Sequence, residues 1–261
     1  MLRLRILSAV IGAPIFVAMI WLGSGWFATA ITVLVIIGLF EYYLPWPNKN
    51  IFPALWAGVA FGAVLPVMTI LGYQAYVPAL LAILVAITLI WQIFARRRVR
   101  AGVDAGVTVL GVLYAGLLPS FLISTRLMAH GREYLLVAVG AVWACDIAAY
   151  FFGRWLGRHK LAPDISPHKT IEGAIAGVVA AIGATAVGAA AGWLSWPQAI
   201  VLGALVGVLA QIGDLVASML KREVGIKDYG TAIPGHGGIL DRFDGLFFTA
   251  PFVFFLLKLL H

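Results

Sequence analysis

Charged residues are scarce in this sequence. Lysine, arginine, aspartate and glutamate together make up 11% of its 261 residues, and 62% are hydrophobic, whereas about a quarter of the residues in a soluble domain are charged. This shortage excludes a soluble globular domain, a disordered chain and a nucleic-acid-binding protein. The sequence also contains a single cysteine, which excludes an intrachain disulfide.

Long apolar runs make up most of the sequence. A helix needs about 20 apolar residues to cross a membrane, and the breaks between the runs are short and rich in Gly, Pro or Arg, as helix ends require. The sequence therefore predicts an all-α polytopic integral membrane protein with about nine transmembrane helices. The predicted spans are Ile6–Leu22, Trp26–Leu44, Ile51–Leu71, Tyr76–Phe94, Val103–Leu127, Tyr134–Phe152, Ile171–Leu194, Ala199–Leu220 and Phe243–Leu260.

The distribution of basic residues predicts the orientation. With nine spans, 15 of the 18 lysines and arginines fall on one side, and only Arg126, Arg132 and Lys258 fall on the other. Because cytoplasmic loops carry an excess of Lys and Arg, we predict the amino terminus inside and the carboxyl terminus outside, in the cell (inner) membrane, with the functional site facing the cytoplasm. The basic cluster at residues 96–100 is interpreted as a topology anchor that also touches anionic lipid heads, and a binding site is the alternative.

Acidic residues divide the chain into two halves. Up to Phe121 the only acids are Glu41 and Asp104, both near span ends, and nine more follow from Glu133 onward. An ionisable group inside a membrane helix is costly unless it faces a polar cavity, so such a group is a functional candidate. We therefore predict a scaffold of lipid-facing helices over residues 1–133 and the functional site over residues 134–261.

Two carboxylates lie inside predicted spans. Asp146 shares a helical face with Tyr150 and Arg154, which makes a polar stripe toward the cytoplasmic end. Asp214 lies on a second stripe, whose outer part is glycine, allowing close helix packing, and whose inner part is polar. This second stripe comprises Gly203, Gly207, Gln211, Asp214, Ser218 and Lys221 or Arg222. We interpret it as the wall of a cavity open to the cytoplasm.

The first long cytoplasmic loop enters a span through the residues Ser166, Pro167, His168, Lys169 and Thr170. A helix amino terminus presents N–H groups and the positive end of a dipole, so together with Lys169 it would suit a phosphate. Ordinary capping by Ser166 or Thr170 explains the same residues equally well. The loop alone leaves both interpretations open.

The second long loop, residues 221–240, is rich in glycine. Its glycines are Gly225, Gly230, Gly235, Gly237 and Gly238. Such a density allows backbone N–H groups to form a nest that holds an anion, although the P-loop pattern G-x-x-x-x-G-K-[ST] is absent from the sequence.

This loop ends in an acidic segment at the predicted start of the last span. Asp241 and Asp244 lie there, where carboxylates often act only as helix caps. Basic loops suit polyphosphate, and paired acids suit Mg²⁺, which proteins usually hold through one or two carboxylates plus substrate phosphates. The residues therefore indicate a membrane enzyme that handles a phosphorylated substrate with Mg²⁺ at the cytoplasmic face.

The segment from Ser218 to Asp244, SMLKREVGIKDYGTAIPGHGGILDRFD, resembles the signature of the phosphatidate cytidylyltransferases, also called CDP-diacylglycerol synthases. Every fixed position of the pattern S-x-Φ-K-R-x4-K-D-x-G-x2-Φ-P-x-H-G-G-Φ-x-D-R-Φ-D matches, Φ being apolar. Residues 146–173 also resemble the family's nucleotide-side region, whereas the first half of the chain resembles it only in being hydrophobic. Two positions depart from the family's usual pattern: Ile147-Ala148 stand where a hydroxyl or glycine is usual, and Ala217 stands where an acid is frequent.

The resemblance implies transfer of CMP from CTP to phosphatidate, with CTP, phosphatidate and membrane lipid as partners. It implies that Asp214 and Asp241 bind Mg²⁺, and it leaves room for a second cation and for a homodimer. The implied catalytic residues are Asp214, Lys221, Arg222, Lys227, Asp228, Asp241, Arg242 and Asp244. The implied CTP- and cofactor-binding residues are Asp146, Tyr150, Ser166, Lys169, Thr170, Ser218, His236, Gly237 and Gly238.

Two other functions remain alternatives. A CTP-dependent lipid-alcohol kinase shares parts of this region, but the full signature over residues 218–244 argues against it. A transporter of a phosphorylated lipid or anion would use the same polar cavity, but it does not explain why carboxylates should flank an anion site without a metal.

Overall fold

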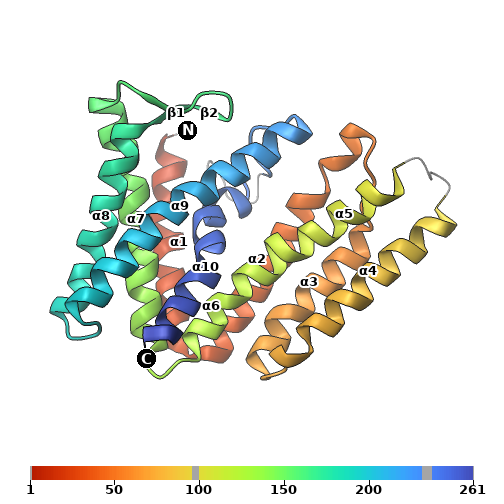
Figure 1. Cartoon of the computed structure of the whole chain (residues 1–261), viewed down its shortest axis with the longest axis horizontal. Helices are drawn as coiled ribbons and strands as arrows, with labels where there is room; N and C mark the ends of the chain where they lie inside the picture. Colours follow the sequence, from red (N-terminus) through yellow and green to blue (C-terminus); the bar gives the residue numbers. More distant parts are fainter. Residues whose placement is uncertain (1, 96–99, 231–236, 261) are drawn as a thin grey trace. The chain divides into compact units, whose positions relative to one another are not determined.

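The computed structural model describes residues 2–95, 100–230 and 237–260, which are mostly helical (Figure 1). The longer helices are α1 (Leu2–Leu22), α2 (Ser24–Tyr43), α3 (Leu55–Ile70), α4 (Val77–Phe94), α5 (Ala101–Gly111), α6 (Leu118–Arg126), α7 (Gly131–Leu156), α8 (Ile171–Ala190), α9 (Trp196–Val224) and α10 (Leu240–Leu260). The shorter elements are the 3₁₀ turns η1 (Trp46–Lys49) and η2 (Gln74–Tyr76), the π-helical turn η3 (Val112–Leu117), and the strands β1 (Lys160–Ala162) and β2 (Ser166–Thr170).

Each of the nine predicted apolar runs coincides with a helix, the fifth run being α5, η3 and α6 in succession. Within the described residues, seven helical segments are long and apolar enough to cross a membrane. Two shorter apolar helices, Val10–Leu22 and Leu55–Ile70, accompany them. The predicted all-α polytopic membrane fold is therefore confirmed.

The chain divides into two compact units. Unit 1 comprises Met1–Ser124 and Val224–Arg242, and unit 2 comprises Thr125–Glu223 and Phe243–His261. The boundaries fall inside α6, at the end of α9 and within the first turn of α10. The glycine-rich loop therefore belongs to unit 1, whereas the strands and most of α9 and α10 belong to unit 2. The predicted functional division at residue 133 stays a prediction.

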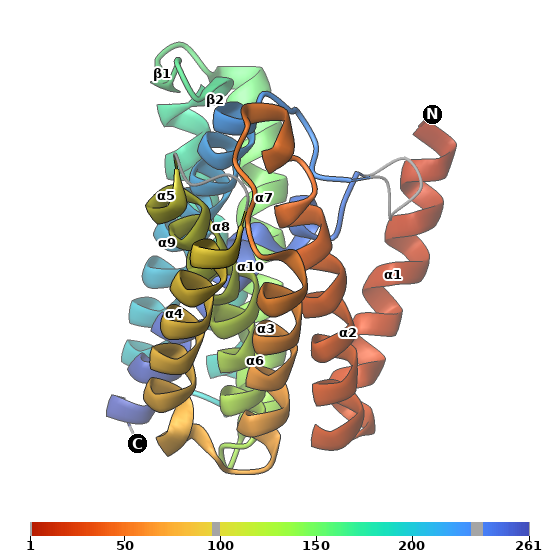
Figure 2. The same cartoon turned by 90° about the vertical axis from the view of Figure 1, so that its right-hand side faces the viewer.

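In unit 1, the helices α2, α3 and α4 lie side by side (Figure 2). Tyr43 at the end of α2 is buried, and its hydroxyl donates a 2.6 Å hydrogen bond to the carbonyl oxygen of Thr108 on α5. The Thr108 hydroxyl accepts from the backbone N–H of Ala54 at 2.8 Å, and Asp104 Oδ1 accepts from that of Phe52 at 2.9 Å. Helix α5 thus fixes the segment that leads into α3.

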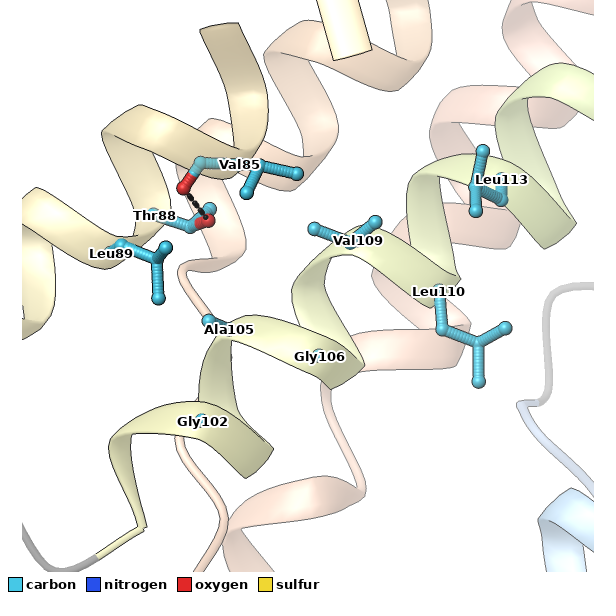
Figure 3. A pocket seen from close by; sticks show the side chains of 9 residues that line it. All are labelled: Val85, Thr88, Leu89, Gly102, Ala105, Gly106, Val109, Leu110 and Leu113. Carbon is cyan, nitrogen blue, oxygen red and sulfur yellow. Dashed lines mark hydrogen bonds between the residues drawn. The ribbon is translucent and has the colours of Figure 1, made fainter. Parts of the chain in front are cut away.

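An apolar pocket of about 370 Å³ lies between α4 and α5 in unit 1 (Figure 3). Gly102 and Gly106 of α5 leave room for it because they carry no side chain. Thr88 of α4 contributes a hydroxyl to the lining, but this hydroxyl donates to the carbonyl oxygen of Val85 in its own helix at 2.9 Å. The pocket therefore offers mainly hydrocarbon surface.

In unit 2, the helices α7, α8 and α9 approach one another closely at glycines. A Cβ atom on Gly173 of α8 would lie 2.6 Å from the carbonyl oxygen of Ala149 on α7, and one on Gly207 of α9 would lie 2.8 Å from Cα of Val178 on α8. Small residues allow helix backbones to approach in this way within a membrane. The close packing predicted for the glycine part of the α9 stripe is confirmed.

We expect Gly207→Ala to lower the thermal unfolding midpoint of the purified protein, because the new methyl group would meet backbone that has little freedom to move aside. Overpacking of this kind costs about 1–3 kcal/mol. Gly183→Ala on α8 is the matched control, since a Cβ atom there would have no described atom within 4 Å, and it should leave the midpoint unchanged. Equal midpoints for the two variants would contradict the close α8–α9 contact.

A short hairpin leads into α8, and the sequence analysis, which predicts helices alone, does not anticipate it. Strands β1 and β2 pair antiparallel, with Lys160 opposite Thr170. Glu172 in the first turn of α8 accepts from the backbone N–H groups of Arg158 and His159 at 3.1 and 3.2 Å. Its Oε1 also lies 2.6 Å from His159 Nδ1. These contacts tie the hairpin to the amino end of α8.

Candidate active site

Two residues predicted in the site contact each other in unit 2. Lys169 Nζ lies 2.8 Å from Asp214 Oδ2, and it donates to the carbonyl oxygen of Gln211 at 3.4 Å. The Gln211 side chain donates to the carbonyl oxygens of Gly207 at 2.7 Å and Ala174 at 3.1 Å, which holds this part of α9 against α8. The side chains of Lys169 and Asp214 are 22% and 42% exposed. The pair is therefore placed by strand β2 and helix α9 and is still accessible.

Thr170, the neighbour of Lys169, caps α8. Its hydroxyl accepts from the backbone N–H of Gly173 at 3.2 Å, and the residue is buried. The two interpretations of this segment therefore concern different residues, because Thr170 caps the helix while Lys169 is directed at Asp214. A phosphate bound beside that carboxylate would be within reach of the lysine.

Asp214 belongs to a wider group of charged residues in unit 2. The carboxylate of Asp244 on α10 lies within electrostatic range of Asp214, Asp146 and Lys221. Asp244 Oδ1 also accepts from the backbone N–H of Gly245 at 2.7 Å. Lys221 is only 9% exposed, so its positive charge lies inside the protein beside these acids. Helices α7, α9 and α10 each contribute an acid to this group.

Asp214 is the carboxylate of this group that could serve as a ligand to Mg²⁺. Among the residues that the structure describes, no three His, Cys, Asp or Glu side chains are grouped so as to hold a metal on their own, as zinc sites usually require. Mg²⁺ keeps several waters and commonly uses one or two carboxylates plus substrate phosphates, and Asp214 could supply one of these ligands. Asp241, the other predicted ligand, belongs to unit 1, so the sharing of one ion by both carboxylates stays a prediction.

Asp241 organises the glycine-rich loop of unit 1. Its Oδ2 accepts from the backbone N–H groups of Tyr229 at 2.8 Å and Gly238 at 2.9 Å. Gly237 has φ +90°, a conformation that favours glycine, and a Cβ atom there would lie 3.0 Å from Asp241 Oδ2. The N–H of Gly238, predicted as part of an anion nest, is thus bonded to a carboxylate of the protein itself.

A further carboxylate, Glu41, contacts the end of this loop, and the sequence predicts no role for it. This carboxylate on α2 is 7% exposed, and its Oε1 and Oε2 accept from the backbone N–H groups of Ile239 and Leu240, each at 2.9 Å. The available signal was an ionisable residue in an apolar span. By that rule the sequence indicates Asp146 and Asp214, which lie within predicted spans, whereas Glu41 lies near a span end.

The remaining predicted site residues lie at exposed or half-buried positions. Those of unit 2 are Asp146, Tyr150 and Arg222, which are exposed, and Ser166 and Ser218, which are half-buried. Those of unit 1 are Lys227, Asp228 and Arg242, all exposed. His236 lies outside the described residues. Each unit therefore carries exposed charged residues of its own.

The chain is thus a polytopic membrane protein whose candidate site carries acids and lysines at and near the ends of apolar helices. A family model described as the cytidylyltransferase family matches residues 3–260 of the chain. The chain belongs to this family of nucleotidyltransferases. The match covers the first half of the chain as well, which the motif resemblance does not reach.

Two relatives are similar to the chain over nearly its whole length, and a third over about three fifths of it. A protein named phosphatidate cytidylyltransferase from Synechocystis sp. is 35% identical, with 98% of this chain and 96% of the relative covered. One of the same name from Staphylococcus haemolyticus is 33% identical over 98% of this chain and 99% of the relative. A third, from Bacillus subtilis, is 40% identical over 60% of this chain and 59% of the relative.

Proposed function

We propose that this membrane enzyme transfers CMP from CTP to phosphatidate, giving CDP-diacylglycerol and pyrophosphate. The observation that supports this best is the similarity, over nearly the whole chain, to proteins named phosphatidate cytidylyltransferase. The Lys169–Asp214 pair and the neighbouring acids add to it. A lipid phosphate and a nucleoside triphosphate both need such charged partners in an apolar surrounding.

In the proposed reaction, an oxygen of the lipid phosphate attacks the α-phosphorus of CTP. The bond from the α-phosphorus to the oxygen that bridges to the β-phosphate breaks, and pyrophosphate leaves with that oxygen and its electron pair. The attacking phosphate is already ionised, so no strong base is needed. Positioning and charge neutralisation must therefore supply the catalysis.

Basic residues of the chain would neutralise the phosphates. Lys169 would donate a hydrogen bond to a phosphate oxygen of CTP. Its ammonium group lies 2.8 Å from Asp214 Oδ2, and the residue is half-buried. Lys221 would bind pyrophosphate or the lipid phosphate, since it presents a buried positive charge on α9. We also assign binding of pyrophosphate or the lipid phosphate to Lys227 and Arg242, which are exposed in unit 1.

Mg²⁺ is the cofactor that we propose, with Asp214 and Asp241 as its ligands. When bound, the ion would neutralise charge on the phosphates. The Asp214 side chain is 42% exposed and hence reachable. Asp241 is oriented by the hydrogen bonds that its Oδ2 accepts from two backbone N–H groups.

The site would face the cytoplasm in the cell membrane. This part of the proposal rests on the 15-to-3 division of basic residues in the sequence. The hairpin of unit 2 and the glycine-rich loop of unit 1 would then both be cytoplasmic, and the turn between α6 and α7 would lie on the opposite side.

Cysteine labelling should show this sidedness. In a Cys145→Ala background, which removes the single native cysteine, Pro163→Cys and Lys227→Cys place thiols at exposed positions of the two loops. An impermeant reagent should label both only after the cytoplasmic side is opened, whereas Ala129→Cys, exposed between α6 and α7, should be labelled in intact cells. External labelling of either loop would overturn the proposed topology.

Labelled CTP distinguishes the proposed transferase from the other candidates. Purified protein in phosphatidate-containing vesicles should move the label of [α-³²P]CTP into lipid and release that of [γ-³²P]CTP as pyrophosphate. A lipid-alcohol kinase given diacylglycerol would instead place the γ-label in lipid. A transporter would leave CTP intact.

A further inference from the structure

Glu41 holds the beginning of α10 from a distant point of the sequence. Its two oxygens accept from the N–H groups of Ile239 and Leu240, 198 and 199 residues away, at 2.9 Å each. The first N–H groups of a helix have no partner within the helix, and hydrogen bonds to a carboxylate are stronger than those to a neutral acceptor. The position of α2 therefore determines where α10 begins in unit 1.

The glycines of the loop leave room for this carboxylate. A Cβ atom on Gly238 would lie 2.5 Å from Glu41 Oε2, and one on Gly230 would lie 2.8 Å from Glu41 Oε1. Real Cβ atoms essentially never approach other atoms that closely. Neither position accepts a side chain while Glu41 stays in place, so the two glycines admit a buried carboxylate.

Asp241 lies in the same arrangement. It immediately follows Leu240 in the chain, and its Oδ2 accepts from the N–H groups of Tyr229 and Gly238. Glu41 and Asp241 together bind the successive N–H groups of residues 238–240. The backbone that Glu41 fixes is thus the backbone that carries the side chain of Asp241.

We propose that Glu41 is a positioning residue for CMP transfer, which orients Asp241 by fixing the N–H groups of Ile239 and Leu240. This inference rests on the proposed function, and it assigns a role in the reaction to a helix of the first half of the chain. Glu41 acts through the loop backbone and not on the substrate. A carboxylate that served only stability would instead change the amount of folded protein, leaving its turnover unaltered.

Glu41→Gln tests the proposal, because glutamine offers one acceptor oxygen and turns an NH₂ group toward the second backbone N–H. We expect kcat per folded enzyme to fall about 10- to 100-fold, the scale of a small misplacement at a reacting centre. The KM for CTP should change far less than kcat, since the basic residues that bind the phosphates are unaltered. The Mg²⁺ concentration that gives half-maximal activity should rise.

Asp104→Asn is the matched control. Asp104 is also a buried carboxylate of unit 1, with 3% of its surface exposed. It accepts a hydrogen bond from the backbone N–H of Phe52, which is not part of the glycine-rich loop. Its variant should lose stability and keep kcat. Hydrogen exchange supplies a readout besides activity, because the amides of residues 238–240 should exchange faster in Glu41→Gln and at the wild-type rate in Asp104→Asn.

A double-mutant cycle tests the contact directly. Gly238→Ala should lower kcat in the wild-type background, where its methyl group displaces the carboxylate of Glu41. Once Glu41→Ala has removed that carboxylate, the methyl group has room, so the second change should cost less. Strictly additive effects would show that the two residues are not coupled.

The outcomes distinguish the proposed function from the positioning role of Glu41. If the wild-type protein makes no CDP-diacylglycerol, the proposed function fails, and hydrogen exchange still reports whether Glu41 holds the loop. If the wild type is active and Glu41→Gln keeps its kcat and its amide protection, only the positioning role is refuted.

Discussion

Asp214→Asn is expected to lower kcat for CMP transfer about 100- to 1,000-fold, as for the loss of a central electrostatic group. The substitution keeps the shape of the side chain and removes the charge that would bind Mg²⁺. It also weakens the contact with Lys169, but both side chains are partly exposed, at 42% and 22%. An exposed pair of this kind contributes about 1 kcal/mol or less. Loss of folding therefore does not explain loss of activity.

Thermal unfolding with and without Mg²⁺ provides the control for this prediction. Without the ion, Asp214→Asn should unfold close to the wild-type temperature, whereas Asp241→Asn should unfold at a lower temperature because the buried Oδ2 of Asp241 accepts hydrogen bonds from two backbone N–H groups. The stabilisation that Mg²⁺ gives to the wild type should vanish in both variants, because a ligand raises apparent stability only where it binds. Retained turnover in either variant, or Mg²⁺ stabilisation that survives both substitutions, would remove this pair as the metal site.

Lys169→Met is expected to raise the KM for CTP at least about 10-fold, the effect of losing a charged hydrogen bond worth about 1.5–3 kcal/mol. The KM for phosphatidate should change less, because we assign Lys169 to the nucleotide. Methionine keeps much of the length of the side chain without the charge, and the Thr170 cap of α8 is left in place. Initial-rate measurements with each substrate varied in turn give the two constants.

The matched control for Lys169 is Lys160→Met. Lys160 is an exposed lysine in β1 of the same hairpin, so the same change there removes a positive charge without touching Asp214. It should leave both KM values near those of the wild type. Equal effects of the two variants on CTP would mean that Lys169 acts only through the general charge of the hairpin.

The helices were predictable from the sequence because apolar runs long enough to cross a membrane have few other solutions. The nine runs all became helices, and the glycine stripe around Gly203 and Gly207 correctly indicated close packing. The hairpin escaped prediction because β1 has three residues and β2 five. Strands so short show no useful alternation of apolar and polar residues.

The sequence indicates candidate site residues but does not predict their contacts. Motif and charge both selected Lys169 and Asp214, but their 2.8 Å contact depends on how α8 and α9 pack, which no local pattern specifies. Glu41 escaped for a different reason. Its partners are backbone N–H groups nearly 200 residues away. Because every residue except proline carries the same backbone N–H group, the sequence does not indicate which of these groups a carboxylate binds.

The fate of the oxygens of the lipid phosphate shows whether the enzyme transfers CMP to phosphatidate. Phosphatidate carrying ¹⁸O in its non-bridging phosphate oxygens is incubated with CTP, Mg²⁺ and the purified protein, and the products are analysed by mass spectrometry. If the lipid phosphate attacks the α-phosphorus, all of the label appears in CDP-diacylglycerol and the pyrophosphate is unlabelled. Labelled pyrophosphate, or CDP together with a lipid that has gained a phosphate, would contradict CMP transfer by this enzyme.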